Sequence, residues 1–332
     1  MTRPVILCTL PMHASGAALL APVAELVVAP DTGADTLRRM VRDADYLLVR
    51  SHLPADLFDG APRLKGVVRN GTGLDMIPVE AATALGIPVA NVPGANAQAV
   101  AEYCIGAFLA LARRFGAMDA ALRGAGWAEA RALSAPTVEL AGKTAGIVGL
   151  GNIGGRLARI CAEAFGMTVL ASQPGEASLP AFATRATLDD LLRQSDFVSL
   201  NCPLTPQTHH LLDEARLRAM KPTAFLVNAA RGEVVDEAAL ARALGERWIA
   251  GAALDVFARQ PLARAHPLLA LDNVILTPHA ASLTQESSEK MSTGAARQLL
   301  QLMAGERPEF LVNPQAWDGH ASRRHAMEVQ RA

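Results

Sequence analysis

A glycine-rich turn constrains the fold of this chain more than any other feature of its sequence. The turn follows a predicted strand, residues 144–148, and precedes a predicted helix, residues 155–165. In such a strand–turn–helix unit, Gly149 permits the tight turn, Gly151 lets a pyrophosphate approach the backbone, and Gly154 lets helix and strand pack closely. The first N–H groups of the helix can bind phosphate. The pattern therefore predicts a site for NAD or NADP, with a glycine-rich turn that binds no ligand as the alternative.

Short apolar strands alternate with helical segments on both sides of this turn. The predicted strands cover 4–9, 25–29, 46–50, 66–69 and 87–91 before it, and 168–171, 197–200, 224–228, 249–254 and 274–277 after it. Longer helices are predicted over 97–113 and 285–304. Apolar strands that alternate with helices indicate parallel sheets covered on both faces. Because 332 residues exceed what one core usually holds, we expect two such α/β units.

Composition narrows the class of protein. Apolar residues make up 51% and charged residues 19% of the chain, and the net charge is −1. This balance favours a large core and gives no electrostatic basis for binding nucleic acid or an anionic membrane. The four cysteines lack the spacing of metal ligands and are expected to be buried thiols. An apolar run near the N-terminus is interrupted at Pro11 and His13, so we expect a cytoplasmic protein without a membrane span.

Three turns after the glycine motif carry residues suited to chemistry. Arg231 follows one predicted strand, Asp255 follows a second and His279 follows a third. Because ligands bind outside the carboxyl ends of parallel strands, we expect these turns to converge. An Arg can bind a carboxylate with two parallel hydrogen bonds, and a His can exchange a proton near neutral pH. Taken singly, each has a plainer interpretation, as a solvated ion-pair partner or a surface histidine.

These motifs, in their order along the chain, resemble the D-isomer-specific 2-hydroxyacid dehydrogenase family. That family includes phosphoglycerate dehydrogenases, glyoxylate/hydroxypyruvate reductases, formate dehydrogenases and phosphite dehydrogenases. The resemblance covers about residues 45–314 and is carried by 68–75, 96–102, 148–154, 202–208, 228–236, 251–257 and 277–281.

The resemblance implies a Rossmann cofactor domain, residues 97–284, inserted into a flavodoxin-like substrate domain made of residues 1–96 and 285–332. Both would be doubly wound parallel sheets. It implies an NAD(P)-dependent oxidoreductase that interconverts a small 2-oxoacid and its D-2-hydroxyacid. A homodimer is expected from the family alone. The alternatives are a dehydrogenase for formate-like or phosphite-like anions and, in another class, a non-catalytic NAD(H)-sensing protein of the corepressor type.

The resemblance also assigns roles to single residues. Arg231 would bind the substrate carboxylate and polarise the 2-oxo group, His279 would donate or accept the proton, and Asp255 would hold the nicotinamide carboxamide. The other implied dinucleotide contacts are Asn152, Ile153, Cys202, Pro203, Thr208, Ala229, Ala230 and Ala281. No metal is expected, because His209 and His210 have no further ligand at suitable spacing.

Two positions depart from the family pattern. Gln260 stands where the family has a Glu that pairs with the catalytic His, and a neutral amide can orient His279 but cannot stabilise its cationic form. Formate dehydrogenases also carry Gln there. Gln173, beside Ser172 at the end of a predicted strand, stands where NAD-specific members have an Asp that binds the ribose and repels a 2′-phosphate. NADP is therefore admissible, with Glu176 as an alternative residue for the ribose.

Basic residues also end two predicted strands of the N-terminal unit. Arg50 and Ser51 follow one strand, and the next is followed by Arg69, Asn70, Gly71 and Thr72. Backbone N–H groups of the glycine turn could bind a carboxylate, and the two arginines could bind an anionic distal group on the substrate, such as a phosphate, a sulfonate or a second carboxylate. The alternative is that one or both arginines pair with surface carboxylates.

Overall fold

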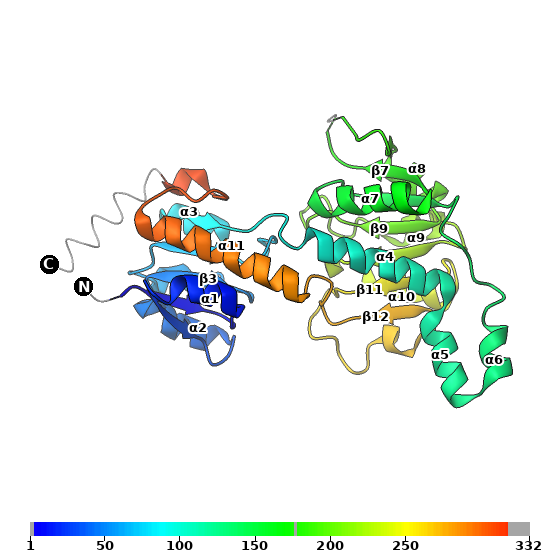
Figure 1. The fold of residues 1–332 in the computed structure, drawn as a ribbon, viewed down its shortest axis with the longest axis horizontal. Helices are drawn as coiled ribbons and strands as arrows, with labels where there is room; N and C mark the ends of the chain where they lie inside the picture. The colour runs from blue at the N-terminus through cyan, green and yellow to red at the C-terminus, as the bar shows by residue number, and fades with distance from the viewer. Residues whose placement is uncertain (1–2, 176–177, 318–332) are drawn as a thin grey trace. The chain divides into compact units, whose positions relative to one another are not determined.

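The structure is a computed structural model that describes residues 3–175 and 178–317. The described chain forms two compact units. Unit 1 holds the residues up to Asn96 and from Thr284 onward, and unit 2 runs from Ala97 to Leu283. Each unit is a parallel sheet with helices on both faces (Figure 1). The predicted fold class of two doubly wound parallel sheets is therefore confirmed.

Unit 1 is built on a five-stranded sheet with the order β2-β1-β3-β4-β5. Its strands are β1 (Val5–Cys8), β2 (Glu25–Val28), β3 (Tyr46–Val49), β4 (Gly66–Arg69) and β5 (Val89–Ala90). Its helices are α1 (Ala14–Leu20), α2 (Ala34–Met40), α3 (Val79–Ala84) and α11 (Gln285–Ala304), with 3₁₀ turns η1 (Val41–Asp43) and η2 (Leu57–Gly60). Helix α11 packs against α1, and its Leu299 and Leu302 share a core with Ile6 and Leu48. The late helix thus completes a fold begun at the N-terminus.

Unit 2 is built on a seven-stranded parallel sheet with the order β12-β11-β10-β9-β6-β7-β8. Its strands are β6 (Thr144–Val148), β7 (Thr168–Ser172), β8 (Thr184–Arg185), β9 (Phe197–Leu200), β10 (Phe225–Asn228), β11 (Gly251–Leu254) and β12 (Val274–Leu276). Its helices are α4 (Ala97–Arg113), α5 (Phe115–Gly124), α6 (Trp127–Ala132), α7 (Asn152–Phe165), α8 (Leu188–Gln194), α9 (Glu214–Ala219) and α10 (Glu237–Gly245), with 3₁₀ turns η3 (Gly232–Val234) and η4 (Pro267–Ala270). The strand order reverses between β6 and β9, and doubly wound sheets bind ligands at such a point.

Different helices cover the two faces of the unit 2 sheet. Helices α4 and α7 pack together over one face, where Phe108, Leu157 and Phe197 are fully buried. Helices α8, α9 and α10 cover the other face, with Leu192 and Leu240 in the core. A sheet buried on both faces needs apolar residues at successive strand positions, which is why its strands read as continuous apolar runs.

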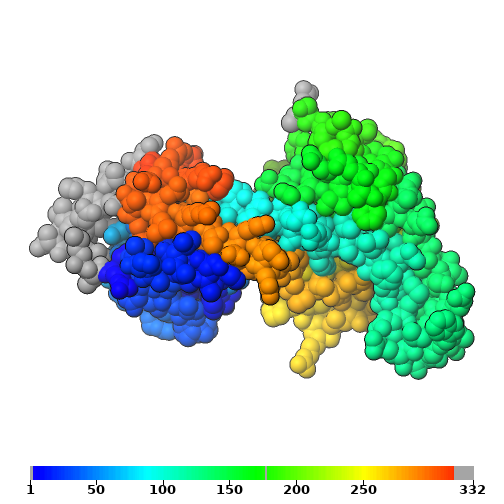
Figure 2. All heavy atoms as spheres, viewed as in Figure 1, coloured from blue at the N-terminus to red at the C-terminus, as the bar shows by residue number. Residues whose placement is uncertain are grey.

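Most predicted elements are present. Helices α4 and α11 coincide with the predictions for 97–113 and 285–304. Helix α7 begins at Asn152, before the predicted start at residue 155, because Gly151 already serves as its N-cap. Strand β8 and helices α5 and α6 have no clear sequence signal, since β8 has two residues and α5 has none buried. Helices α5 and α6 project from the body of unit 2 (Figure 2).

The cysteine prediction is confirmed for Cys8, Cys104 and Cys161, which are buried thiols, whereas Cys202 is half-buried. Burial raises the pKa of the first three to about 12, and it also raises the pKa of Cys202. All four thiols are therefore protonated near neutral pH. Within residues 3–175 and 178–317, no helix has both the length and the apolar composition needed to cross a membrane.

Candidate active site

The glycine turn has the geometry that each glycine was expected to provide. Gly149 has a φ of 90°, and a Cβ there would lie 2.9 Å from the Asn201 carbonyl carbon. A Cβ on Gly154 would lie 1.9 Å from the Gly149 carbonyl oxygen, so only glycine allows α7 to pack this close to β6. A Cβ on Gly151 would meet no described atom within 4 Å. The backbone at Gly151 is thus open to approach by a ligand.

The start of α7 fits an anionic group. No described side chain caps this helix, and its first turn contains no acidic residue. The first N–H groups of a helix, here those of Asn152, Ile153 and Gly154, have no partner within the helix. They therefore offer donors and a positive helix end to a phosphate. These residues fit the pyrophosphate of a dinucleotide.

A cation of the neighbouring strand β8, Arg185, lies near the end of β7, and the sequence pattern does not predict this. Ser172 and Gln173 are half-buried there, and the Ser172 carbonyl accepts from the Gly149 N–H at 2.8 Å. Arg185 of β8 lies opposite Ala171 of β7, and its Nη1 donates to the Gly175 carbonyl at 2.9 Å. The guanidinium therefore lies at the turn that follows Gln173. Glu176, the alternative ribose ligand, lies outside the described residues.

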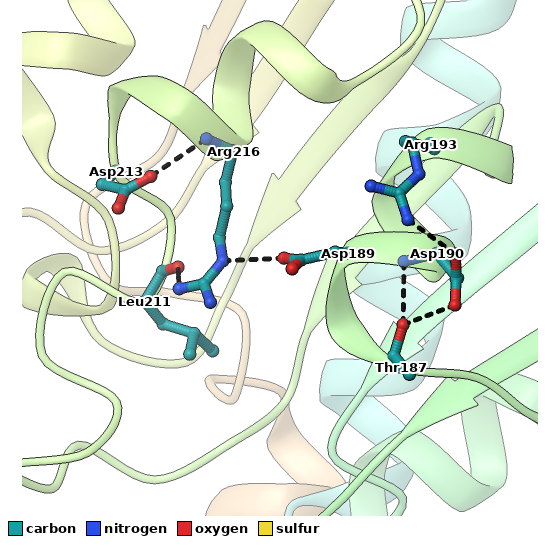
Figure 3. A network of polar contacts seen from close by, with 7 residues as sticks. All are labelled: Thr187, Asp189, Asp190, Arg193, Leu211, Asp213 and Arg216. Carbon is teal, nitrogen blue, oxygen red and sulfur yellow. Dashed lines mark hydrogen bonds and ion pairs between the residues drawn. The ribbon is translucent and has the colours of Figure 1, made fainter.

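The loop after β9 is held in a fixed shape. Thr208 Oγ1 donates to the Pro203 carbonyl at 2.6 Å and accepts from the Thr205 N–H at 2.7 Å. Cys202 leads into this loop. At its far end, Arg216 donates from Nη1 to the Leu211 carbonyl at 2.8 Å and from Nε to Asp189 at 3.1 Å (Figure 3).

The same network joins two helix starts (Figure 3). Asp213 accepts from the Arg216 N–H at 2.9 Å and caps α9, while Thr187 accepts from the Asp190 N–H at 3.1 Å and caps α8.

The adjacent rings of His209 and His210 are stacked, with their centroids 4.0 Å apart. The described part of the chain holds no cluster of three His, Cys, Asp or Glu side chains that could bind a metal.

Asp255 organises the turn that carries His279. The residue is 1% exposed, and its carboxylate accepts from the Thr277 hydroxyl at 2.6 Å and from the N–H groups of Ala280 and Ala281 at 2.8 and 2.9 Å. The His279 N–H donates to the Asp255 carbonyl at 2.8 Å. One buried residue thus fixes the backbone on both sides of His279. The implied contact between Asp255 and the carboxamide stays a prediction.

Tyr103 extends this arrangement from α4. Its hydroxyl lies 2.7 Å from Thr277 Oγ1, and burial raises the pKa of Tyr103 to about 12. Because the Thr277 hydroxyl already donates to the Asp255 carboxylate, Tyr103 must donate to Thr277. The result is a polar chain from α4 through Thr277 to Asp255, which ties the end of β12 to the helix layer.

The pairing of His279 with Gln260 selects one imidazole tautomer. His279 Nδ1 lies 3.0 Å from Gln260 Oε1, and Gln260 Nε2 donates to the Phe257 carbonyl at 3.4 Å. The carbonyl can only accept, so the amide nitrogen must face Phe257 and the amide oxygen must face His279. His279 then carries its proton on Nδ1 when neutral. Acid–base chemistry is left to Nε2.

Arg231 lies in a turn held by the strand that precedes it. Asn228 Nδ2 donates to the Arg231 carbonyl at 2.9 Å, and Asn228 Oδ1 accepts from the Ala230 N–H at 3.1 Å, which also fixes Ala229 between them. A Cβ on Gly232 would lie 1.9 Å from the Phe257 carbonyl carbon. Only glycine therefore lets this turn cross the segment that leads to Gln260.

In unit 1 the predicted substrate residues are largely bound to backbone groups. Arg69 donates to the carbonyls of Val49, Asn70 and Gly73 at 2.8 to 3.1 Å. Thr72 Oγ1 donates to the Val92 carbonyl at 3.2 Å, and the Val92 N–H donates to the Gly71 carbonyl at 2.9 Å. Arg69 and the turn after β4 therefore hold one another in place.

The end of β3 is held by buried Thr9, whose Oγ1 accepts from the N–H groups of Arg50 and Ser51. The Arg50 guanidinium donates to the Pro11 carbonyl, and burial lowers the pKa of Arg50. Ser51 Oγ and Asn70 Oδ1 are buried without a hydrogen-bond partner within residues 3–175 and 178–317. These two polar atoms end adjacent strands and would gain from a polar ligand.

Comparisons relate the chain to known proteins. The family described as D-isomer specific 2-hydroxyacid dehydrogenase, NAD binding domain, matches residues 105–281. A glyoxylate reductase from Aeropyrum pernix is 45% identical over 288 residues, which cover 84% of this chain and 86% of that protein. A D-3-phosphoglycerate dehydrogenase from Methanocaldococcus jannaschii is 40% identical over 314 residues, which cover 93% of this chain and 59% of that protein.

Solved structures show the same similarity. The NADPH-dependent glyoxylate/hydroxypyruvate reductase from Sinorhizobium meliloti, in complex with NADP and malonate, is 30% identical to this chain. It aligns with a TM-score of 0.83 and covers 95% of this chain and 98% of its own.

Proposed function

The chain belongs to the D-isomer-specific 2-hydroxyacid dehydrogenase family, and from this premise we propose that it reduces glyoxylate or another small 2-oxoacid to the D-2-hydroxyacid. As an NAD(P)-dependent dehydrogenase, it is not the non-catalytic NAD(H) sensor considered as an alternative. The observation that carries the proposal is the pairing of His279 with Gln260 on a turn fixed by Asp255. The Arg231 turn follows β10, which pairs with β11, the strand that leads to Asp255.

The chemistry divides among these residues. When bound, the nicotinamide supplies a hydride to the carbonyl carbon of the oxoacid. Arg231 holds the substrate carboxylate with its planar guanidinium and polarises the oxo group. His279 donates a proton from Nε2 to the oxygen that gains the electron pair of the carbonyl, and Gln260 holds the opposite nitrogen. The product is the hydroxyacid, and His279 is left neutral.

A small substrate suits unit 1, because Arg69 directs three of its five N–H donors to backbone carbonyls. An acid with an anionic distal group is the second candidate, favoured by the half-buried Arg50 and by the buried Ser51 Oγ, which has no hydrogen-bond partner among the described residues. A turnover screen of glyoxylate, hydroxypyruvate, 3-phosphohydroxypyruvate and 3-sulfopyruvate separates the small substrate from the acid with a distal anion.

Formate and phosphite oxidation belong in the same screen, and turnover of these anions alone would contradict the proposal. A homodimer and a cytoplasmic location stay predictions.

Arg185 leads to a prediction about cofactor choice. Arg185→Ala should lower kcat/KM for NADPH at least about tenfold, since a hydrogen bond to a charged group contributes roughly 1.5–3 kcal/mol. The same substitution should leave kcat/KM for NADH within about twofold of the native value. Gln173→Asp should shift the preference toward NADH, because a carboxylate repels the 2′-phosphate. The measurement is the NADPH/NADH ratio of kcat/KM, with Arg193→Ala on α8 as the control. An unchanged ratio in Arg185→Ala would exclude this residue from 2′-phosphate binding.

Gln260 leads to a prediction about pH. Gln260→Glu places a negative charge at the 3.0 Å contact with His279 Nδ1 and stabilises the protonated imidazole. Reduction needs the protonated form, so the alkaline limb of log kcat/KM should move up by about 1 to 2 pH units. Oxidation needs the neutral form and should require more alkaline conditions. Profiles in both directions that superimpose on those of the native enzyme would show that proton transfer at His279 does not control the rate.

A further inference from the structure

The segment that carries Gln260 is mostly exposed. Residues 258–266 lie between β11 and η4, and among them only Leu262 and His266 are half-buried. This segment stands out from unit 2 (yellow in Figure 2). A surface loop of this kind moves readily unless its backbone is tied down. The contact between Gln260 and His279 therefore depends on whatever fixes the two ends of the segment.

One carboxylate fixes both ends. Glu237 is the first residue of α10, and its Oε2 accepts from the Ala258 N–H at 3.1 Å. Its Oε1 lies 3.0 Å from His266 Nε2. The side chains of Glu237 and His266 are 18% and 20% exposed, so water competes little with the contact between them. Ala258 and His266 bracket Gln260 in sequence.

The role of His266 follows from its other nitrogen. His266 Nδ1 accepts from the Leu268 N–H at 3.3 Å and caps η4. The proton of the neutral ring is then on Nε2, which donates to Glu237. Glu237 thus receives two donors, one from each end of the segment. An amide at this position has one acceptor oxygen and would turn its N–H₂ toward one of these donors.

We propose that Glu237 is a positioning residue for the reaction: by binding Ala258 and His266 together, it keeps Gln260 Oε1 against His279 Nδ1. The idea rests on the proposed acid–base role of His279. Glu237 contacts neither the substrate nor the cofactor in this scheme, and it acts entirely through Gln260. Its effect should therefore disappear when the Gln260 side chain is removed.

A double-mutant cycle tests this dependence. The variants are Glu237→Gln, Gln260→Ala and the double variant, each assayed for 2-oxoacid reduction and for dinucleotide binding. Glu237→Gln should lower kcat about five- to tenfold, with little change in KM or in the dinucleotide Kd. In the Gln260→Ala background the same substitution should change kcat less than about twofold. Glu214→Gln, which removes exposed ion pairs to Arg218 and Arg242, is the matched control.

Glu237→Asp keeps the experiment informative if Glu237→Gln folds poorly. Aspartate retains both acceptor oxygens on a shorter side chain, so it should recover part of the lost kcat. The inference is overturned if the losses of the two single variants multiply in the double variant, or if Glu237→Gln lowers dinucleotide affinity as much as kcat. It is also overturned if neither Glu237 variant affects kcat. If Gln260→Ala itself leaves reduction unchanged, the proposed role of Gln260 fails first, and that result is distinct from the others.

Discussion

His279→Ala is expected to lower kcat/KM for 2-oxoacid reduction by roughly 10²- to 10⁴-fold, the range that a general acid usually contributes. The turn that carries His279 is held by Asp255 through backbone N–H groups at 2.8 and 2.9 Å, none of which involves the imidazole. Removing the ring should therefore leave the turn and the dinucleotide site intact. The loss should appear in kcat, with the Kd for NADPH or NADH unchanged.

The measurement is steady-state reduction across pH, with dinucleotide titration and thermal unfolding as controls for the fold. In the proposed mechanism, reduction depends on the protonated imidazole, so the variant should also lose the alkaline fall in its profile. A variant that retains near-native kcat/KM with its real substrate would remove His279 from the mechanism. It would then favour hydride transfer without a proton relay, as in the formate-like alternative.

The sequence predicts those parts of the site whose constraint is local. Within one strand–turn–helix unit, Gly149 has a φ of 90°, Gly154 leaves no room for a Cβ beside the Gly149 carbonyl oxygen, and Gly151 leaves the backbone open. The position of Arg231 and His279 at one sheet edge is predictable for a related reason, and their catalytic roles stay predictions. Each ends a strand of one parallel sheet, and parallel strands bring their carboxyl ends to the same edge.

Residues that act through tertiary contacts are not predictable in this way. Arg185 reaches the end of β7 because β8, a two-residue strand with no periodicity, pairs beside it. Tyr103 meets Thr277 across 174 positions of sequence. Glu237 reads as an acidic residue in the first turn of a helix, and its contacts with Ala258 and His266 depend on how α10 packs beside the segment after β11. No local pattern specifies such pairings.

Arg231→Ala is expected to lower kcat/KM for the oxoacid by two decades or more, because losing a two-pronged contact to a carboxylate beside the reacting carbon should cost ~3 kcal/mol. Asn228 holds this turn through the Arg231 carbonyl and the Ala230 N–H, so the backbone should keep its shape without the guanidinium. Dinucleotide affinity should therefore be unchanged, and Arg264→Ala in the exposed segment after β11 serves as the control.

Arg231→Lys separates charge from geometry at this position. Lysine keeps the positive charge but offers a single donor point in place of the planar fork, so it should recover only part of the lost kcat/KM. Full recovery in Arg231→Lys would mean that charge alone acts on the substrate. If Arg231 binds the shared 2-oxocarboxylate, the loss of kcat/KM should be equal for every acid tested. A loss of kcat/KM confined to acids with a distal anion would instead place Arg231 at that distal group. The reacting carboxylate is common to all the acids, so a residue that binds this carboxylate cannot discriminate among them.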